Sequence, residues 1–173
     1  MGLSNSTELG TPSEDGFHEM FHEIDRIANS KINGSKYLTY SDYYTGQNGK
    51  TLNQVLEEEA NEYKKSIKDQ LIASGKYSKV GAWSVYMSMN DELDALTPLE
   101  RSDVSDIWSG LTKGKVGEGH KPSYWKNNKA SVEAFAEMGS ATLVNPESLS
   151  QIKKYFPKSY DFWLEMLEHY GKI

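Results

Sequence analysis

The sequence predicts a mainly helical fold, α+β with minimal strand, and three observations support this prediction. Several segments of ten or more residues repeat apolar side chains every three or four positions, as amphipathic helices do. Two segments carry a helix-start signal, in which a Thr is followed directly by Pro and, three residues after the Thr, by Glu. These signals occur at Thr11 and Thr97. The 173 residues include 12% aromatic side chains, which is enough for a hydrophobic core. We therefore expect a single domain over residues 11–173, preceded by a flexible polar leader at 1–10.

The expected elements can be placed along the chain from these patterns. The first helix follows Thr11, carries Phe17, Phe21 and Ile24 at helical spacing, and ends between 29 and 34. The Tyr- and Thr-rich segment 37–44 is expected to hold a short strand, and the glycine-rich segment 110–122 to form a loop. The remaining expected helices cover 52–71, 78–90, 98–108, 131–143, 147–155 and 160–170.

The composition excludes several classes of function. The absence of Cys rules out disulfides, thiolate catalysis and Cys-ligated metals. A net charge of −6, with lysines scattered along the chain, argues against a general nucleic-acid binder. The first residues lack the pattern of a secretory signal, and no apolar run approaches the ~20 residues that span a bilayer. We therefore expect a soluble protein with no nucleic-acid or membrane partner.

The most informative motif is His18-Glu19-Met20-Phe21-His22, an H-E-x-x-H sequence within the first expected helix. Residues four apart lie one turn apart on the same helical face, so both imidazoles can reach one metal ion. Zinc accepts neutral imidazole at about 2.0–2.1 Å. Glu19 is rotated by about 100° from His18, which makes it a poor ligand but a suitable general base toward a water on the metal. The motif predicts a zinc site, and the alternative is a surface helix that happens to hold two histidines.

A catalytic zinc site needs a third protein ligand, which in this chain must be a carboxylate or another His. Glu133 and Glu137 are the best candidates, because they lie four apart beside an apolar stripe, where unpaired charges are costly. One of them can ligate while the other orients a His ring, although a solvated Glu pair is the alternative. His120 is a further candidate ligand, whereas His169 lies on a Glu-rich helix and is interpreted as a surface residue.

Other acidic residues are interpreted by their position on the helices. Asp25 shares the face of His18 and His22, so it could either hydrogen-bond a ligand ring or pair with Arg26 or a lysine. A second acidic group is expected to form a solvated helix face, and its members are Glu57, Glu58, Glu59 and Glu62.

The segment 117–125 precedes the Glu133 helix and combines glycines with His120, Tyr124 and Trp125. Such a loop suits the wall of a substrate site or a flexible lid. His120 or Tyr124 could donate a hydrogen bond to a developing oxyanion, which would make them catalytic residues. The alternative is a structural loop packed by its aromatic residues.

The H-E-x-x-H motif, followed far downstream by Glu-x-x-x-Glu on a helix, resembles the zincin metallopeptidases of the gluzincin kind. The resemblance implies a zincin-like fold with an active-site helix and a downstream Glu helix. It also implies that His18, His22 and Glu133 bind Zn²⁺, that Glu19 is the general base, and that Glu137 supports a histidine. The implied activity is hydrolysis of peptide bonds in a peptide or protein substrate.

A second series of motifs is similar to the C-terminal domains of phage minor head (capsid) proteins and related polymorphic-toxin zincins of the anthrax lethal factor kind. This resemblance spans roughly residues 15–170 and implies a phage head, or the N-terminal domain of a parent protein, as partner. The motifs are Ser105-Asp106-Ile107-Trp108-Ser109-Gly110-Leu111-Thr112, Gly119-His120, Tyr124-Trp125, Glu133-Ala134-Phe135-Ala136-Glu137 and Tyr155-Phe156-Pro157-Lys158-Ser159-Tyr160.

The sequence departs from zincins in one respect. Zincins place strands before the active helix, including an edge strand that pairs with extended substrate. Here either the segment 37–45 supplies that strand or the chain is the C-terminal part of a longer protein. Two rival interpretations are a virion-associated module that keeps the zincin scaffold without turnover, and a helical interaction domain without metal.

Overall fold

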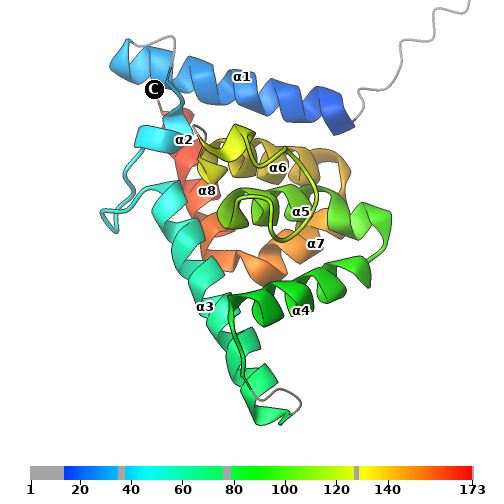
Figure 1. Ribbon diagram of the computed structural model, residues 1–173. Helices are drawn as coiled ribbons and strands as arrows, with labels where there is room; N and C mark the ends of the chain where they lie inside the picture. Colours follow the sequence, from blue (N-terminus) through cyan, green and yellow to red (C-terminus); the bar gives the residue numbers. More distant parts are fainter. Residues whose placement is uncertain (1–13, 35–37, 76–78, 127–128, 173) are drawn as a thin grey trace, which may run out of the picture.

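The computed structural model describes residues 14–34, 38–75, 79–126 and 129–172, and throughout these ranges the regular elements are helices (Figure 1). The predicted mainly helical class is therefore confirmed. The expected leader at 1–10 and the helix start at Thr11 lie outside the described residues. In chain order the elements are α1 (Glu14–Asn33), α2 (Tyr40–Tyr43), α3 (Leu52–Ala73), α4 (Ala82–Asp94), α5 (Pro98–Thr112), the short 3₁₀ helix η1 (Tyr124–Lys126), α6 (Ala130–Val144), α7 (Pro146–Tyr155) and α8 (Pro157–Tyr170).

Helix α6 is the central element of the bundle. It packs against α1, α5 and α7, and it also contacts α2, α3 and α8. From Ala130 to Ala141 every residue except Val132 is buried, because the helix has neighbours on almost every side. Figure 1 shows α1 lying across one end of the bundle near α6, and α4 at the opposite end. The helices with the two sequence motifs, α1 and α6, are thus direct neighbours.

Close packing of aromatic rings fixes the distance between α1 and α6. Phe21 of α1 lies with its ring centroid 6.3 Å from that of Phe135 in α6 and 5.9 Å from that of Trp163 in α8. A Cβ at Gly139 of α6 would lie 2.2 Å from Cγ of Phe21, so only glycine permits this approach. The contact sets the separation at which side chains of α1 and α6 can meet.

The predicted helices are present, although α4 begins four residues after the expected position 78 and α8 begins three residues before the expected position 160. The start of α5 follows its sequence signal. At the N-terminus of α5 the Oγ1 of Thr97 accepts a hydrogen bond from the Glu100 N–H, and the Glu100 carboxylate accepts one from the Thr97 N–H at 2.9 Å. The predicted start of the following loop at Gly110 is three residues too early, because α5 continues to Thr112. Gly110 stays helical because it packs against Trp125 and Ala130, where a side chain would not fit.

The expected strand at 37–44 is wrong for the part that the structure describes, because Tyr40–Tyr43 form the short helix α2. A strand needs a neighbouring strand to satisfy its backbone, whereas here the carboxylate of Asp25 accepts hydrogen bonds from the backbone N–H of Ser41 at 2.7 Å and from its hydroxyl at 2.6 Å. The N–H of Tyr44 donates to the carbonyl of Tyr40 at 2.8 Å, which closes the helical turn. The Asp25 carboxylate on α1 thus accepts a backbone hydrogen bond that a neighbouring strand would otherwise accept.

The acidic group on α3 is not uniformly solvated, so the expectation was wrong for Glu59. Its side chain is buried and accepts hydrogen bonds from the backbone N–H groups of Lys158 and Ser159, each at 2.8 Å, and from the Ser159 hydroxyl at 2.6 Å. These N–H groups belong to the first turn of α8, which has no carbonyl partners for them. Glu59 therefore caps α8 from a helix about a hundred residues earlier, whereas Glu57, Glu58 and Glu62 are exposed.

Candidate metal centre

Helix α1 presents the two histidines of the H-E-x-x-H motif on the face that points toward α6. Nε2 of His18 lies 2.9 Å from Nε2 of His22, and the two rings are nearly perpendicular, with centroids 4.5 Å apart. Their side chains are 19% and 25% exposed, so the site is partly shielded but open to solvent. The i,i+4 spacing produces this convergence through local helical geometry alone.

Helix α6 adds the third group, Glu133, whose side chain is almost completely buried. Its Oε2 lies 3.5 Å from Nε2 of His18 and 3.3 Å from Nε2 of His22. Four ligands placed tetrahedrally at zinc bond lengths of 2.0–2.1 Å are separated by about 3.3 Å. The three nitrogen and oxygen atoms are therefore spaced as three ligands of one tetrahedral ion would be, and they belong to the residues that the sequence predicts as ligands.

The charge state of Glu133 suits a cation-binding role. Burial alone would raise the pKa of its carboxyl, but His18, His22 and a hydrogen bond from Tyr124 hold that pKa well below its usual range. Oε1 accepts the hydrogen bond from the Tyr124 hydroxyl, whereas Oε2 is buried without a hydrogen bond. A buried carboxylate oxygen without a donor is costly unless a cation neutralises it. The structure thus leaves Oε2 available for a metal ion.

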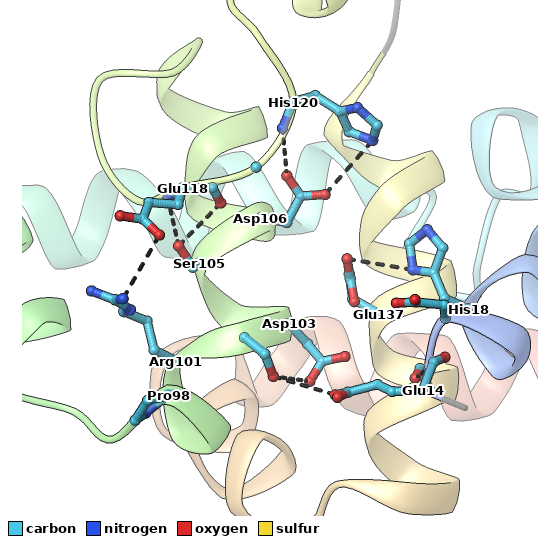
Figure 2. Close-up of a pocket in the computed structure, with 14 residues that line it drawn as sticks. Glu14, His18, Pro98, Arg101, Asp103, Ser105, Asp106, Glu118, His120 and Glu137 are labelled. Atoms are coloured by element: carbon cyan, nitrogen blue, oxygen red, sulfur yellow. Dashed lines mark hydrogen bonds and ion pairs between the residues drawn. The ribbon is translucent and has the colours of Figure 1, made fainter. Parts of the chain in front are cut away.

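Glu137 lies one turn after Glu133 on α6 and contacts the opposite side of the His18 ring. Its Oε1 is 3.4 Å from Nδ1 of His18 (Figure 2). Burial raises the pKa of the Glu137 carboxyl, and the nearby Asp103 adds to this effect. The two carboxylates raise the pKa of His18 to about 10. In the absence of a metal, the ring is therefore held as an imidazolium, because the carboxylates of Glu133 and Glu137 favour a positive charge between them.

Glu19 follows His18 on α1 and is exposed. Burial and the hydrogen bond to Glu133 raise the pKa of Tyr124, and the charge of Glu19 adds a smaller contribution in the same direction. An exposed carboxylate beside the histidines is accessible to water. This position is compatible with the predicted role of a general base.

The loop before α6 brings His120 and Tyr124 to the same place. The two rings stack with centroids 4.0 Å apart, and Nε2 of His120 lies 3.5 Å from Oε2 of Glu133. The indole N–H of Trp125 donates to the carbonyl of His120 at 3.1 Å. Both expected catalytic residues of this loop therefore contact the group formed by the histidines of α1 and Glu133.

The loop is fastened to the helices beneath it rather than free. The hydroxyl of Ser105 in α5 donates to the carbonyl of Glu118 and accepts from its N–H, and the side-chain carbonyl of Asn90 in α4 accepts from the Gly117 N–H at 2.9 Å. These bonds attach the loop to α5 and to α4. The segment is therefore held against the helices by its backbone, in the position expected for the wall of a substrate site.

Asp25 lies apart from this group. Its described hydrogen bonds run to Ser41, and the guanidinium of Arg26 bonds Glu23 instead. Burial raises the pKa of Asp25 to about 6 against the opposing effect of the hydrogen bonds from Ser41. Asp25 thus joins α1 to α2, a role that neither interpretation of the sequence included.

His169 is exposed, as the sequence predicted, but it is not without contacts. Nδ1 of His169 lies 2.7 Å from the hydroxyl of Tyr40, and its ring packs against Tyr44. These contacts belong to the junction of α2 and α8, away from the candidate metal centre.

An acidic cavity of about 600 Å³ adjoins the centre and shares His18, His120 and Glu137 with it (Figure 2). Sequence reasoning missed its other carboxylates. Asp103 and Asp106 lie three apart on α5, beside the buried Val104 and Ile107, so the argument used for Glu133 would also have identified them. The carboxyl-bearing residues that line the cavity are Glu14, Asp15, Asp103, Asp106, Glu118 and Glu137.

Asn145 hydrogen-bonds two of the residues that line this cavity. Its amide donates to Glu14 at 2.8 Å and to Asp103 at 3.3 Å, which ties the first turn of α1 to α5 at the start of α7. Ser140 of α6 adds a hydrogen bond to the backbone carbonyl of Glu14 at 3.2 Å. The N-terminal end of α1, and with it His18, is therefore anchored by polar contacts as well as by Phe21.

Comparisons with protein-family models, with curated proteins and with solved structures found no significant match. Among the described residues, no helix is both long and apolar enough to cross a membrane. The functional interpretation of the site therefore depends on its own geometry and chemistry.

Proposed function

We propose that this protein is a zinc-dependent metallopeptidase-like hydrolase in which His18, His22 and Glu133 hold the metal. The observation that carries the proposal is the triangle of two Nε2 atoms and one buried carboxylate oxygen, with separations of 2.9, 3.3 and 3.5 Å. Two imidazoles and one carboxylate are the ligand set of several catalytic zinc sites, which leave a fourth position for water. The zincin-like character of the scaffold is part of this proposal.

A bound zinc ion would supply a Lewis acid that lowers the pKa of a water toward about 7 and polarises a carbonyl group. Glu19 is the group we assign to accept the proton of the attacking water and to pass it to the leaving amine. Its exposed position next to His18 supports this assignment, because a general base must reach both water and substrate.

Tyr124 and His120 are assigned to stabilise the negative charge that develops on the carbonyl oxygen. Hydrogen-bond donors beside a reacting carbonyl stabilise the charge that develops on its oxygen. The stacking of the two rings supports the assignment, because it holds both side chains next to the ligand group, and the Tyr124 hydroxyl would turn from Glu133 to the carbonyl oxygen during the reaction. The cavity of about 600 Å³ provides room for a peptide substrate beside these residues.

The proposal is tested with the Glu19→Gln variant of the chain, purified without a His tag and loaded with zinc. We expect the variant to bind as much zinc as the parent and to lose cleavage of fluorescently labelled casein. His169→Ala is the matched control, since that histidine lies outside the centre. Equal cleavage by the parent and by Glu19→Gln would refute the role of Glu19, and a parent that binds no zinc would refute the metal centre.

A second candidate is a module that binds metal without turnover, for example as part of a phage head or beside the N-terminal domain of a parent protein. One observation favours it: across the described ranges there is no strand, whereas extended substrates commonly bind by pairing with a sheet edge. Zinc binding that depends on His18, together with a failure of the parent to cleave casein or a mixture of unstructured peptides, would support this candidate.

A further inference from the structure

We propose that Asp106, His120 and Glu133 form a second divalent-metal position, which shares Glu133 with the first. The proposal rests on the proposed function only for the first ion, because Glu133 belongs to both groups. The second group draws on α5, on the loop before η1 and on α6, so it is independent of the H-E-x-x-H helix.

The three donor atoms already converge. Nε2 of His120 lies 3.5 Å from Oε2 of Glu133 and 4.0 Å from Oδ2 of Asp106, and one ligand atom from each residue lies within 4.8 Å of the others. Ligands of one tetrahedral ion at about 2.0–2.1 Å are separated by about 3.3 Å, so the side chains would approach one another on binding, Asp106 and Glu133 by at most about 1.5 Å. An exposed His120 ring, at 42%, leaves the remaining coordination positions open to solvent.

The backbone of the loop is held so that His120 faces Asp106 (Figure 2). The N–H of His120 donates to Oδ1 of Asp106 at 3.2 Å, which leaves Oδ2 facing the imidazole. A Cβ at position 119 would lie 1.6 Å from Oδ1, so Gly119 is required for this approach. Stacking on Tyr124 and the indole hydrogen bond from Trp125 hold His120 from two further sides. A ligand that is positioned before binding loses little entropy when the ion arrives.

Charge around the centre also favours a second cation. Glu133, Glu137, Asp103 and Asp106 are all at least nine-tenths buried, and the neighbouring guanidinium, that of Arg101, pairs with Asp94 at 2.8 Å and with Glu118 at 3.7 Å. The carboxyl groups that line the adjoining cavity outnumber its one guanidinium, so a divalent ion bound there would offset the cost of burying them when they ionise. The unbonded Oε2 of Glu133 faces both positions, and a carboxylate can bridge two ions that lie about 3.5–4 Å apart.

The donor set indicates the class of ion. One imidazole and two carboxylates are harder ligands than the two imidazoles and one carboxylate of the first group, and such a set suits Zn²⁺ or Mn²⁺. We therefore expect the first position to fill before the second when zinc is added, because imidazole-rich sites favour zinc.

The test counts bound zinc. The tag-free chain, stripped with a chelator and then dialysed against Zn²⁺, is measured by elemental analysis together with Asp106→Asn, His120→Ala and the control His169→Ala. We expect two ions per chain in the parent and in His169→Ala, and one in each of the other two variants. One ion in the parent would overturn the second position while leaving the proposed function intact, whereas no ion in the parent would overturn both.

Two ions in the parent and also in Asp106→Asn would overturn the assignment, because the extra ion would then be bound elsewhere. One ion in the parent and none in His120→Ala would also overturn it, since His120 would then belong to the first shell. X-ray absorption of the doubly loaded parent gives a second measurement that needs no variant. A zinc–zinc distance of about 3.5–4 Å supports the shared carboxylate, and its absence contradicts it.

Discussion

Nδ1 of His18 lies 3.4 Å from Oε1 of Glu137, while Nε2 of the same ring faces Glu133 at 3.5 Å. One imidazole thus stands between two carboxylates of a single helix, each on its own side of the ring. In metal sites a carboxylate on the outer nitrogen fixes the tautomer and the orientation of the ring, and makes the inner nitrogen a better ligand. The arrangement therefore gives the two carboxylates of α6 different expected roles.

We predict that Glu137→Gln weakens zinc binding about 10-fold, because the amide keeps the volume but loses the charge that orients His18. Glu133→Gln should weaken it much more, since a ligand is removed. Competition with a chromophoric chelator measures both affinities. Equal losses in the two variants would mean that Glu137 is itself a ligand, contrary to the assignment.

We predict that Tyr124→Phe lowers the turnover number for casein cleavage about 10²–10³-fold and leaves the zinc content unchanged, as expected for the loss of an oxyanion donor. Tyr44→Phe is the matched control, because that hydroxyl donates to Glu165 at a distant junction. Steady-state kinetics at saturating zinc provide the comparison. A loss of zinc that parallels the loss of turnover would indicate that Tyr124 acts only by holding Glu133.

The meeting of His18 and His22 could be predicted from the sequence because it depends on one helical turn. The pairing of α1 with α6 required more, since nothing local in the sequence brings residues 18 and 133 together. The chemistry of the ligands supplied that link: a buried carboxylate pair needs a counter-charge, and the two histidines need a third ligand. The prediction therefore followed from the missing counter-charge of the carboxylate pair and the missing third ligand of the two histidines.

The burial of Glu59 and the helical turn at Tyr40 could not be predicted in the same way, because both depend on hydrogen bonds to distant segments. Glu59 looks like its exposed neighbours in sequence, and only the arrival of α8 turns it into a cap. The segment around Tyr40 has the composition of a strand, but the Asp25 carboxylate binds its backbone and favours a helical turn. In both cases a single long-range hydrogen-bonding group overrides the local pattern.

The close approach of Gly139 to Phe21 leads to a prediction about stability. Gly139→Ala should lower the free energy of unfolding by about 1–3 kcal/mol, although alanine is the better helix former, because the new methyl group would overlap the buried Phe21 ring. Urea denaturation followed by circular dichroism measures the change. The double variant Gly139→Ala/Phe21→Leu should recover part of the loss, and no recovery would argue against the ring as the cause.

The capping role of Glu59 predicts a second stability effect. Glu59→Ala should lower the free energy of unfolding by about 2–3 kcal/mol, because it leaves the N–H groups of Lys158 and Ser159 without an acceptor inside the protein. Glu62→Ala removes an exposed ion pair with Lys158 and should change stability far less, because solvent screens exposed pairs. Similar effects of the two substitutions, in the same urea experiment, would contradict the cap.

Burial of Asp25 predicts that stability depends on pH in a defined direction. Its pKa is raised to about 6 in the folded protein from an ordinary value of 3.8, so the folded state disfavours the ionised carboxylate. The contribution of this group is therefore most favourable below pH 4 and declines as the pH rises through 6. The penalty above pH 7 is about 3 kcal/mol, by the conversion of a pKa shift into free energy.

Asp25→Asn removes this titration and keeps an acceptor for the backbone N–H of Ser41. We predict that the stability of the variant relative to the parent increases by about 2 kcal/mol between pH 4 and pH 7.5. Urea denaturation of both proteins in the presence of a chelator gives this difference, because all other titrating groups are common to them and metal binding makes no contribution. A difference that stays constant over this range would show that Asp25 ionises in the folded protein as it does in the unfolded chain, and one that decreases as the pH rises would show that folding lowers its pKa; either result contradicts the prediction.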